Sequence, residues 1–207
     1  MRIDVQLPPG QISHDLAMLA QRLPTLPGPL MPWRPAGAVP VPCAVLWRSA
    51  PSGVYVYVVP ADRRGLAGYV AFTRVRAPQG DIFSPHAKFA ADHQRLGLAT
   101  RIYQWMLDGG ACLLSGARQS EASHRLWRSL GRHRPLGFAQ VTPRALHYLG
   151  TEAPDTAFDD LDTRLLLLGR GRTHDTWASP PSSSRRTPGS TAVEVRSGLS
   201  GPRRSPG

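Results

Sequence analysis

The segment "DHQRLGLATRIYQW", Asp92–Trp105, decides how the rest of this chain is interpreted. A short polar turn with one glycine, Gly97, continues without a break into apolar residues at helical spacing. A helix begins with backbone N–H groups that lack partners and with a partial positive charge, so it can bind phosphate there. Gly97 permits close approach, Ala99 keeps the first turn thin and Arg95 adds a cation. The turn therefore has the parts of a diphosphate cradle, although an ordinary strand-to-helix turn could have the same composition.

The sequence before this turn predicts an antiparallel meander. Three runs rich in β-branched and aromatic residues follow one another with short turns between them, which is typical of strands that pair with their neighbours. Nearer the N-terminus, an alternating run predicts a strand, and leucines at helical spacing predict a helix capped by Ser13 or Asp15. The expected elements are a strand at 3–7, a helix at 13–23 and strands at 43–49, 53–60 and 66–76. Residues 24–42 hold too many prolines for regular structure.

The sequence around and after the turn predicts a parallel β-α-β unit. An extended run, a helix, a nearly all-apolar strand and a second helix follow in this order, which implies a right-handed parallel crossover beside the meander. The expected elements are strands at 86–92 and 111–116, helices at 96–110 and 118–132, and final segments at 137–150 and 159–171. Gly109 and Gly110 are expected to end the first of these helices through a left-handed cap. The fold class is α/β: a mixed sheet with an antiparallel N-terminal meander, a parallel β-α-β half and helices on both faces.

The C-terminal segment is predicted to be a disordered tail. From Ser179 the chain reads "SPPSSSRRTPGSTAVEVRSGLSGPRRSPG", which lacks the apolar side chains that would offset the entropy of ordering it. We place the domain at residues 1–169 and a tail rich in proline, serine and arginine at 170–207.

The net charge of +11 is spread along the chain rather than clustered. Residues 170–207 carry +5, from seven arginines against Asp175 and Glu194, and the rest falls on 169 residues without a long basic run. A solvated, arginine-rich surface explains this pattern better than a nucleic-acid-binding arm does. Loose attraction of the tail to nucleic acid or to an anionic membrane surface is the less favoured alternative.

Cysteine usage and the N-terminal sequence favour a soluble, cytoplasmic protein. Cys43 and Cys112 lie in apolar runs that suit buried thiols, and neither they nor the seven histidines show zinc spacing, so we expect no metal. The start "MRIDVQLPPG" lacks the apolar core of a signal peptide. No apolar run approaches the roughly 20 residues of a membrane span, so we expect no membrane association of that kind.

Two motifs in the chain resemble those of the GNAT acetyltransferase superfamily. That family carries Gln/Arg-x-x-Gly-x-Gly/Ala after its fourth strand, and Gln94, Gly97 and Ala99 match it in register. Many members carry Asn-x-x-Ala-x-x-Leu-Tyr-x-x-x-Gly-Phe on a later helix, where this chain reads "SEASHRLWRSLGR", Ser120–Arg132. The order of strand, helix, meander and β-α-β unit is similar too. The resemblance covers residues 42–138, and more loosely 1–150, and it extends to short GNAT-like proteins of phage and plasmid origin.

The resemblance implies that the chain uses acetyl-CoA as co-substrate and moves its acetyl group to an amine. Backbone groups of Phe89, Ala90 and Ala91 would pair with the pantetheine arm like a short β-ladder. The turn and the first helical residues would hold the diphosphate through N–H groups and one hydroxyl. These residues are Gln94, Arg95, Leu96, Gly97, Leu98, Ala99 and Thr100.

The groups that would move protons depart from the family pattern. Direct transfer in a ternary complex needs a held thioester, a deprotonated amine and a stabilised leaving thiolate. His86 is the candidate base, since histidine titrates near neutral pH, and an ordered water is the alternative. Trp127 stands where the family often has tyrosine, and an indole N–H does not release a proton at useful pH. Either Ser120, Ser123 or water is then left as the acid, or the thiolate leaves unassisted.

The acceptor is expected to be an amine on a small molecule or a protein. The positive net charge argues against a strongly cationic acceptor such as a polyamine. The alternative function is a catalytically degenerate module of the same fold that binds a partner, with the basic tail contacting nucleic acid.

Overall fold

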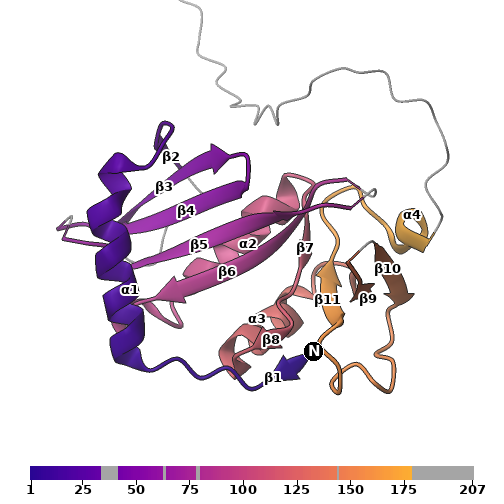
Figure 1. The fold of residues 1–207 in the computed structure, drawn as a ribbon. Coiled ribbons are helices and arrows are strands. Elements are labelled where there is room, and N and C mark those ends of the chain that lie inside the picture. Colours follow the sequence, from indigo (N-terminus) through magenta and orange to yellow (C-terminus); the bar gives the residue numbers. More distant parts are fainter. Residues whose placement is uncertain (34–41, 63, 78–79, 144, 179–207) are drawn as a thin grey trace, which may run out of the picture.

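A mixed β-sheet forms the centre of the molecule (Figure 1). The computed structural model describes residues 1–33, 42–62, 64–77, 80–143 and 145–178. Within these residues the main sheet has nine strands in the order β10-β9-β11-β7-β6-β5-β4-β3-β2. Their bounds are β2 Met31–Pro32, β3 Cys43–Ala50, β4 Gly53–Pro60, β5 Gly68–Val75, β6 Ile82–Phe89, β7 Cys112–Leu114, β9 Leu136–Val141, β10 Leu146–Gly150 and β11 Thr163–Leu167.

The expected antiparallel meander is confirmed and runs from β3 to β6. Each strand pairs with the next over most of its length, and β5 pairs with β6 from Gly68↔Phe89 to Val75↔Ile82. Side chains alternate between the two faces of the sheet, as a two-residue period requires. In β4, Val56 and Val58 enter the largest core cluster, whereas Tyr57 belongs to a separate cluster on the other face.

The expected parallel crossover is also confirmed, but it contributes only one parallel strand pair to the main sheet. Helix α2 (Leu98–Asp108) connects β6 to β7, which pair in parallel. The later strands differ from a continued parallel half, because β11 inserts between β7 and β9 and is antiparallel to both. The left-handed residue after α2 is Gly110, at φ +87°, as its place in the Gly-Gly pair suggested.

Helices cover both faces of the sheet, as the fold class predicted. Helix α1 (Pro9–Arg22) packs Leu16 against Tyr57 on one face. Helices α2 and α3 (Glu121–Leu130) bury Tyr103, Trp127 and other side chains in the largest core, on the opposite face. No helix in the described ranges is both long and apolar enough to cross a bilayer.

The N-terminal elements differ from the prediction in extent and in capping. Strand β1 (Arg2–Ile3) is short and pairs in parallel with β8 (Arg118–Gln119), outside the main sheet. Helix α1 already starts at Pro9, so the predicted caps Ser13 and Asp15 are wrong and lie inside the helix. Proline is tolerated at the first helical position because the N–H that it lacks would have no partner there.

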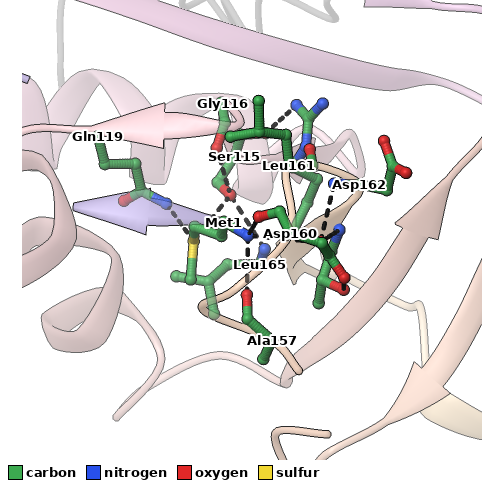
Figure 2. A network of polar contacts seen from close by, with 11 residues as sticks. Met1, Ser115, Gly116, Gln119, Ala157, Asp160, Leu161, Asp162 and Leu165 are labelled. Carbon is green, nitrogen blue, oxygen red and sulfur yellow. Dashed lines mark hydrogen bonds and ion pairs between the residues drawn. The ribbon is translucent and has the colours of Figure 1, made fainter. Parts of the chain in front are cut away.

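A buried polar network holds the N-terminal residue beside β8 and the loop before β11 (Figure 2). The α-ammonium group of Met1 donates to the carbonyl oxygen of Ala157 at 2.8 Å and to that of Asp160, whose carboxylate lies 3.6 Å away. Met1 is fully buried, and an ammonium group removed from water needs such partners. The Asp160 carboxylate also accepts from the N–H groups of Asp162 and Thr163, and these bonds, above all those from Thr163, lower its pKa.

The folded part of the chain continues past the expected domain boundary at Gly169. Helix α4 (His174–Ala178) places Trp177, which is only 5% exposed, in a second core cluster together with Ile82, Leu146 and other residues. Residues 170–178 therefore pack on the domain rather than starting the tail. The rest of the expected tail, 179–207, lies outside the described residues.

Both edges of the main sheet are short or irregular. At one edge, β2 has two residues, and one of them is Pro32. At the other edge, the pairing of β10 with β9 shifts register between Tyr148 and Gly150.

We expect Trp177→Ala to lower the free energy of unfolding by about 3 kcal/mol, because the change leaves a cavity where an indole filled the second core. Urea denaturation followed by circular dichroism measures this. Phe158→Ala is the matched control: Phe158 is 48% exposed, so its loss should cost less than about 1 kcal/mol. Equal unfolding midpoints for Trp177→Ala and the wild type would contradict the packing role of α4.

Candidate functional site

The start of α2 is open to solvent and has no side-chain cap. Gly97 is the N-cap residue, with φ +73° and ψ +4°, and no side chain accepts a hydrogen bond from the first helical N–H groups. The first in-register helical bond runs from the N–H of Arg101 to the carbonyl of Gly97. A Cβ atom built on Gly97 would meet no atom within 4 Å, so the space beside the Cα atom of this residue is open. An anion could therefore approach these N–H groups.

Two left-handed residues shape the turn that precedes α2. Arg95 has φ +60°, the only positive φ at a non-glycine position among the described residues, and Gly97 follows two positions later. A left-handed non-glycine residue costs free energy, and such residues gather at binding sites where the backbone must point at a ligand. Leu96, between them, packs against the main core, while Arg95 is exposed.

The first residues of α2 differ in how deeply their side chains are buried. The side chain of Leu98 is 4% exposed and belongs to the core, so only its backbone could face a ligand. Ala99 packs partly against the same core. Thr100 is half-buried, and no residue in the described part of the chain bonds to its hydroxyl.

Gln94 ties the turn to the end of β6. Its Nε2 donates to the carbonyl oxygen of Phe89 at 2.9 Å. The turn between them is a short 3-10 helix, Ala91–His93, in which the Asp92 carboxylate bonds to the His93 ring at 2.7 Å. Gln94 thus fixes the turn geometry from within the protein, a role that the sequence motif alone did not reveal.

The three residues expected to form a ladder with pantetheine are partly engaged within the protein. The Phe89 carbonyl accepts from Gln94, and the N–H of Ala90 donates to the carbonyl of Ala67 at 2.9 Å. Ala91 already lies in the 3-10 helix rather than in extended backbone. The extended edge that points toward β7 therefore comes from residues 84–89 of β6.

Strands β6 and β7 separate soon after they meet (Figure 1). They pair only at Ile82↔Cys112 and Phe83↔Leu113, whereas β6 pairs with β5 along all eight residues. Beyond Phe83, no strand in the described part of the chain pairs with the free edge of β6. This unpaired edge leads directly to the turn before α2.

His86 lies on the opposite face of the sheet from α2. It shares that face with Lys88, which forms an ion pair with Asp15 of α1. Its ring is exposed and lies 6.1 Å from the ring of Tyr69. Desolvation by the surrounding protein, followed by the positive charge of Lys88, lowers the pKa of His86, although Asp15 acts in the other direction. The lowered pKa favours the neutral imidazole, which is the form that accepts a proton.

Ser120 and Trp127 are both tied to the structure of α3. Ser120 is the N-cap residue, and its hydroxyl oxygen accepts from the N–H of Ser123 at 3.2 Å. Trp127 is 1% exposed and packs edge-to-face with Tyr103. The structure thus gives Ser120 a capping role, and no contact among the described residues joins it to His86.

Sequence patterns could not identify the ion pair beside His86. Asp15 and Lys88 are 73 residues apart, and only the packing of α1 on the sheet brings them together. Among the described residues, no group of three histidine, cysteine, aspartate or glutamate side chains could hold a metal ion. Two shallow hollows, one beside Met1 and Phe158 and one beside Arg74 and Gly80, lie away from this site.

Comparison with known proteins finds structural similarity at low sequence identity. No protein-family model matches the chain, and no curated protein does. Among solved structures, it is similar to a ribosomal-protein-S5-alanine acetyltransferase of Vibrio fischeri, with 16% identity, 58% of this chain and 63% of that one covered, and a TM-score of 0.35. A putative GNAT-family acetyltransferase of Bordetella pertussis has 24% identity, coverage of 57% and 65%, and a TM-score of 0.33. A spermidine N-acetyltransferase chimera that includes Vibrio cholerae sequence has 16% identity, coverage of 57% and 66%, and a TM-score of 0.33.

The fold class is a mixed α/β sheet, defined by the strand order of this chain. This chain spans less than two thirds of each of the solved chains named above. The TM-scores of all three lie below 0.5. The fold class therefore rests on the strand order of this chain, with an antiparallel meander, a parallel crossover and helices on both faces. The names of those proteins describe their own activities and are not evidence for an activity of this chain.

We expect Ser120→Ala to lower the free energy of unfolding by about 1 kcal/mol, because the change removes the cap of α3. Ser120→Asp should keep the stability, since aspartate caps helices well and carries a favourable charge at a helix start. Urea denaturation of both variants, with the exposed Ser129→Ala as control, measures the effect. If the alanine and aspartate variants lose stability equally, the side chain of Ser120 is not acting as a cap.

Proposed function

We propose that this protein is an acyltransferase that moves an acetyl group from acetyl-CoA to an amine in a ternary complex. The observation that carries the proposal is the open, uncapped start of α2 behind two left-handed residues, at the end of a strand whose edge is unpaired. The sequence motif at Gln94, Gly97 and Ala99 supports it.

The diphosphate of the co-substrate would bind to the N–H groups of Gly97, Leu98 and Ala99. The helix dipole and the exposed Arg95 side chain both favour a negative charge at this place. Thr100 offers a hydroxyl one position further along the helix. The open space beside the Cα atom of Gly97 supports a close approach of phosphate oxygens to this turn.

The pantetheine arm would lie along the free edge of β6. Residues 84–89 supply extended backbone groups that no neighbouring described strand uses on that side. An arm with two amide groups can bond to such an edge as an added strand would. The thioester would then lie at the level at which β6 and β7 separate. At that level no strand pairing would block approach to it from either face of the sheet.

His86 would remove the proton from the attacking amine. Its face of the sheet is the α1 face, so the acceptor would approach from there while CoA binds at the start of α2 on the other side. A neutral imidazole is the form that accepts a proton, and the lowered pKa of His86 keeps it in that form. The amine nitrogen bonds to the carbonyl carbon, the carbon–sulfur bond breaks, and the amine proton goes to His86.

A second candidate is a catalytically degenerate module that binds CoA without turnover. It is favoured by the position of Trp127, a buried indole where the resembling family often has a tyrosine hydroxyl. The two candidates differ in one measurement, the release of free thiol from acetyl-CoA in the presence of a panel of small-molecule and peptide amines.

We expect Gly97→Asp to abolish CoA binding and Gly97→Asn to retain much of it. The two side chains have nearly the same size, and both tolerate the left-handed backbone, but only aspartate places a negative charge against the diphosphate. Thermal shift with CoA measures binding, and wild-type protein should show a rise of several degrees at a concentration far above Kd.

Pantetheine, which lacks the nucleotide and its diphosphate, is the matched ligand control and should produce no comparable shift. Equal shifts for the aspartate and asparagine variants would show that the start of α2 does not hold the diphosphate. If millimolar CoA does not raise the melting temperature of the wild-type protein, the proposed function as a whole is contradicted.

We expect the acid limb of the pH profile of kcat/KM to lie below pH 6.5, the ordinary pKa of histidine. His86 must be neutral to act, so activity rises with pH through its pKa, and that pKa is lowered in the folded protein. Lys88→Met removes a positive charge that lowers this pKa and leaves Asp15, which raises it. The limb should therefore move to higher pH in this variant, and it should vanish in His86→Gln. An unchanged limb in His86→Gln would assign the base to another group.

A further inference from the structure

A hollow lined in part by arginine lies where β5 turns into β6, at the far end of β6 from the start of α2. Its volume is about 430 Å³, and it is lined by Arg74, Val75, Arg76, Ala77 and Gly80. Figure 1 shows this turn beside the segment that leads from β11 to α4. A third arginine comes from that segment, because a Cβ atom built on Gly80 would meet Nη2 of Arg172 at 3.2 Å. Cations from two distant parts of the sequence therefore meet at one hollow.

The charges around the hollow do not balance. Arg74 forms an ion pair with the carboxylate of Asp81. Arg76 and Arg172 are exposed, and neither forms an ion pair with a carboxylate in the described part of the chain. Three arginines against one aspartate leave a net charge of +2 beside the hollow. An anion that enters it would meet two guanidinium groups whose N–H donors no acidic side chain occupies.

Arg74 is the cation with the most defined position. Its ion pair holds one edge of the guanidinium group, and its guanidinium carbon lies 4.9 Å from the centre of the Phe83 ring. Such a contact between a cation and an aromatic face restricts the side chain further. One wall of the hollow is therefore ordered before any ligand binds, which lowers the entropy lost on binding.

Phosphate is the anion that fits these groups. Guanidinium groups offer pairs of N–H donors that match phosphate oxygens, and these charge-assisted bonds are stronger than neutral ones. A phosphate monoester carries a charge of about −1.5 to −2 near neutral pH, and two neighbouring phosphodiesters carry a similar total. A single carboxylate would neutralise only half of the excess charge at the hollow.

The hollow is separate from the diphosphate site proposed at the start of α2. Strand β6 begins at Ile82, close to the hollow, and ends at Phe89, before the turn that leads into α2. Seven positions separate these residues, which at a rise of about 3.3 Å per residue gives about 23 Å. The pairing of β6 with β7 at Ile82 and Phe83 also closes the sheet at the hollow's end. A phosphate in the hollow would therefore belong to a second molecule.

We propose that this hollow is a second anion site, which binds a phosphate group independently of the proposed acetyl transfer. Arg76 and Arg172 donate to the phosphate oxygens, and Arg74, already held by Asp81, adds the third positive charge. A small phosphorylated molecule and a nucleic-acid backbone offer the same chemistry, so both sources are tested.

The first measurement is a calorimetric titration with inorganic pyrophosphate at physiological ionic strength. Gly97→Asp serves as the background, since its negative charge blocks the start of α2. We expect pyrophosphate to bind this protein, and the further pair Arg76→Gln and Arg172→Gln to raise its Kd roughly 10-fold or more, because charge-assisted hydrogen bonds are lost.

The pair Arg125→Gln and Arg128→Gln is the matched control. It removes the same charge from two exposed arginines of α3, outside the hollow. At this ionic strength the control pair should change Kd less than about twofold, because distant exposed charges are screened. Equal losses in the two pairs would show general attraction to a basic surface and would overturn the site.

Fluorescence anisotropy with a labelled single-stranded oligonucleotide tests the second source in the same proteins. If the oligonucleotide binds, pyrophosphate does not, and only the hollow pair weakens binding, the phosphate comes from a nucleic-acid backbone and the site stands. If neither probe binds, the proposal is wrong. A missing thermal shift with CoA contradicts the proposed transferase but leaves these titrations unaffected, so the two failures are distinguishable.

A footprint on the wild-type protein needs no substitution. Arg76 and Arg172 are exposed, so an arginine-specific dicarbonyl reagent should modify both, and peptide mass spectrometry measures the extent. Saturating amounts of the probe that binds should protect these two arginines and leave Arg125 and Arg128 as reactive as before. Equal modification of Arg76 and Arg172 with and without the probe would overturn the assignment.

Discussion

The rest of the structure depends on the short contact between β6 and β7. Two residue pairs join these strands, whereas eight join β6 to β5. A sheet is held by its backbone hydrogen bonds, so a strand that leaves its neighbour exposes a row of unsatisfied N–H and C=O groups. The crossover helix α2 brings its own unpaired N–H groups to the end of the same strand. The fold thus gathers two sets of free backbone groups along one line, and a ligand with amides at one end and phosphates at the other would match both.

The separation of the strands also relates the two faces of the sheet. The α2 side carries the turn at Gly97 and the aromatic group of Phe72, Tyr103 and Trp127. The α1 side carries His86 and the Asp15–Lys88 ion pair. Groups on opposite faces can act on one carbonyl only where the sheet is open between them. Beyond Phe83 no described strand pairs with this edge of β6, so no backbone ladder separates the two faces there.

Most of the fold could be predicted because its signals are local. The β-branched run 53–60 matches β4 residue for residue, and the glycine-containing turn marks the start of α2 within two residues. The start of α1 was missed because proline at a first helical position looks like a helix breaker in sequence. The boundary at Gly169 was set too early because one buried indole, Trp177, is enough to anchor a five-residue helix.

The site was less accessible to sequence reasoning than the fold. The motif identified the turn, but the bond from Gln94 to the Phe89 carbonyl, the capping role of Ser120 and the Asp15–Lys88 pair all depend on tertiary packing. Tyr103 has the helical spacing of a core residue, and its ring is buried between those of Phe72 and Trp127.

The two rims of the main sheet have a consequence for handling and for design. An open sheet offers its outermost backbone to any extended peptide that meets it, and long flat rims lead to aggregation. Here one rim is a two-residue strand with a proline, which lacks an N–H to donate, and the other is broken by a shift at Gly150. Within the described part of the chain, neither of these two outer strands gives an incoming peptide a long continuous template. Replacing Pro32, or making the pairing of β10 regular to gain stability, would therefore create an outer strand that can pair with other chains and promote aggregation.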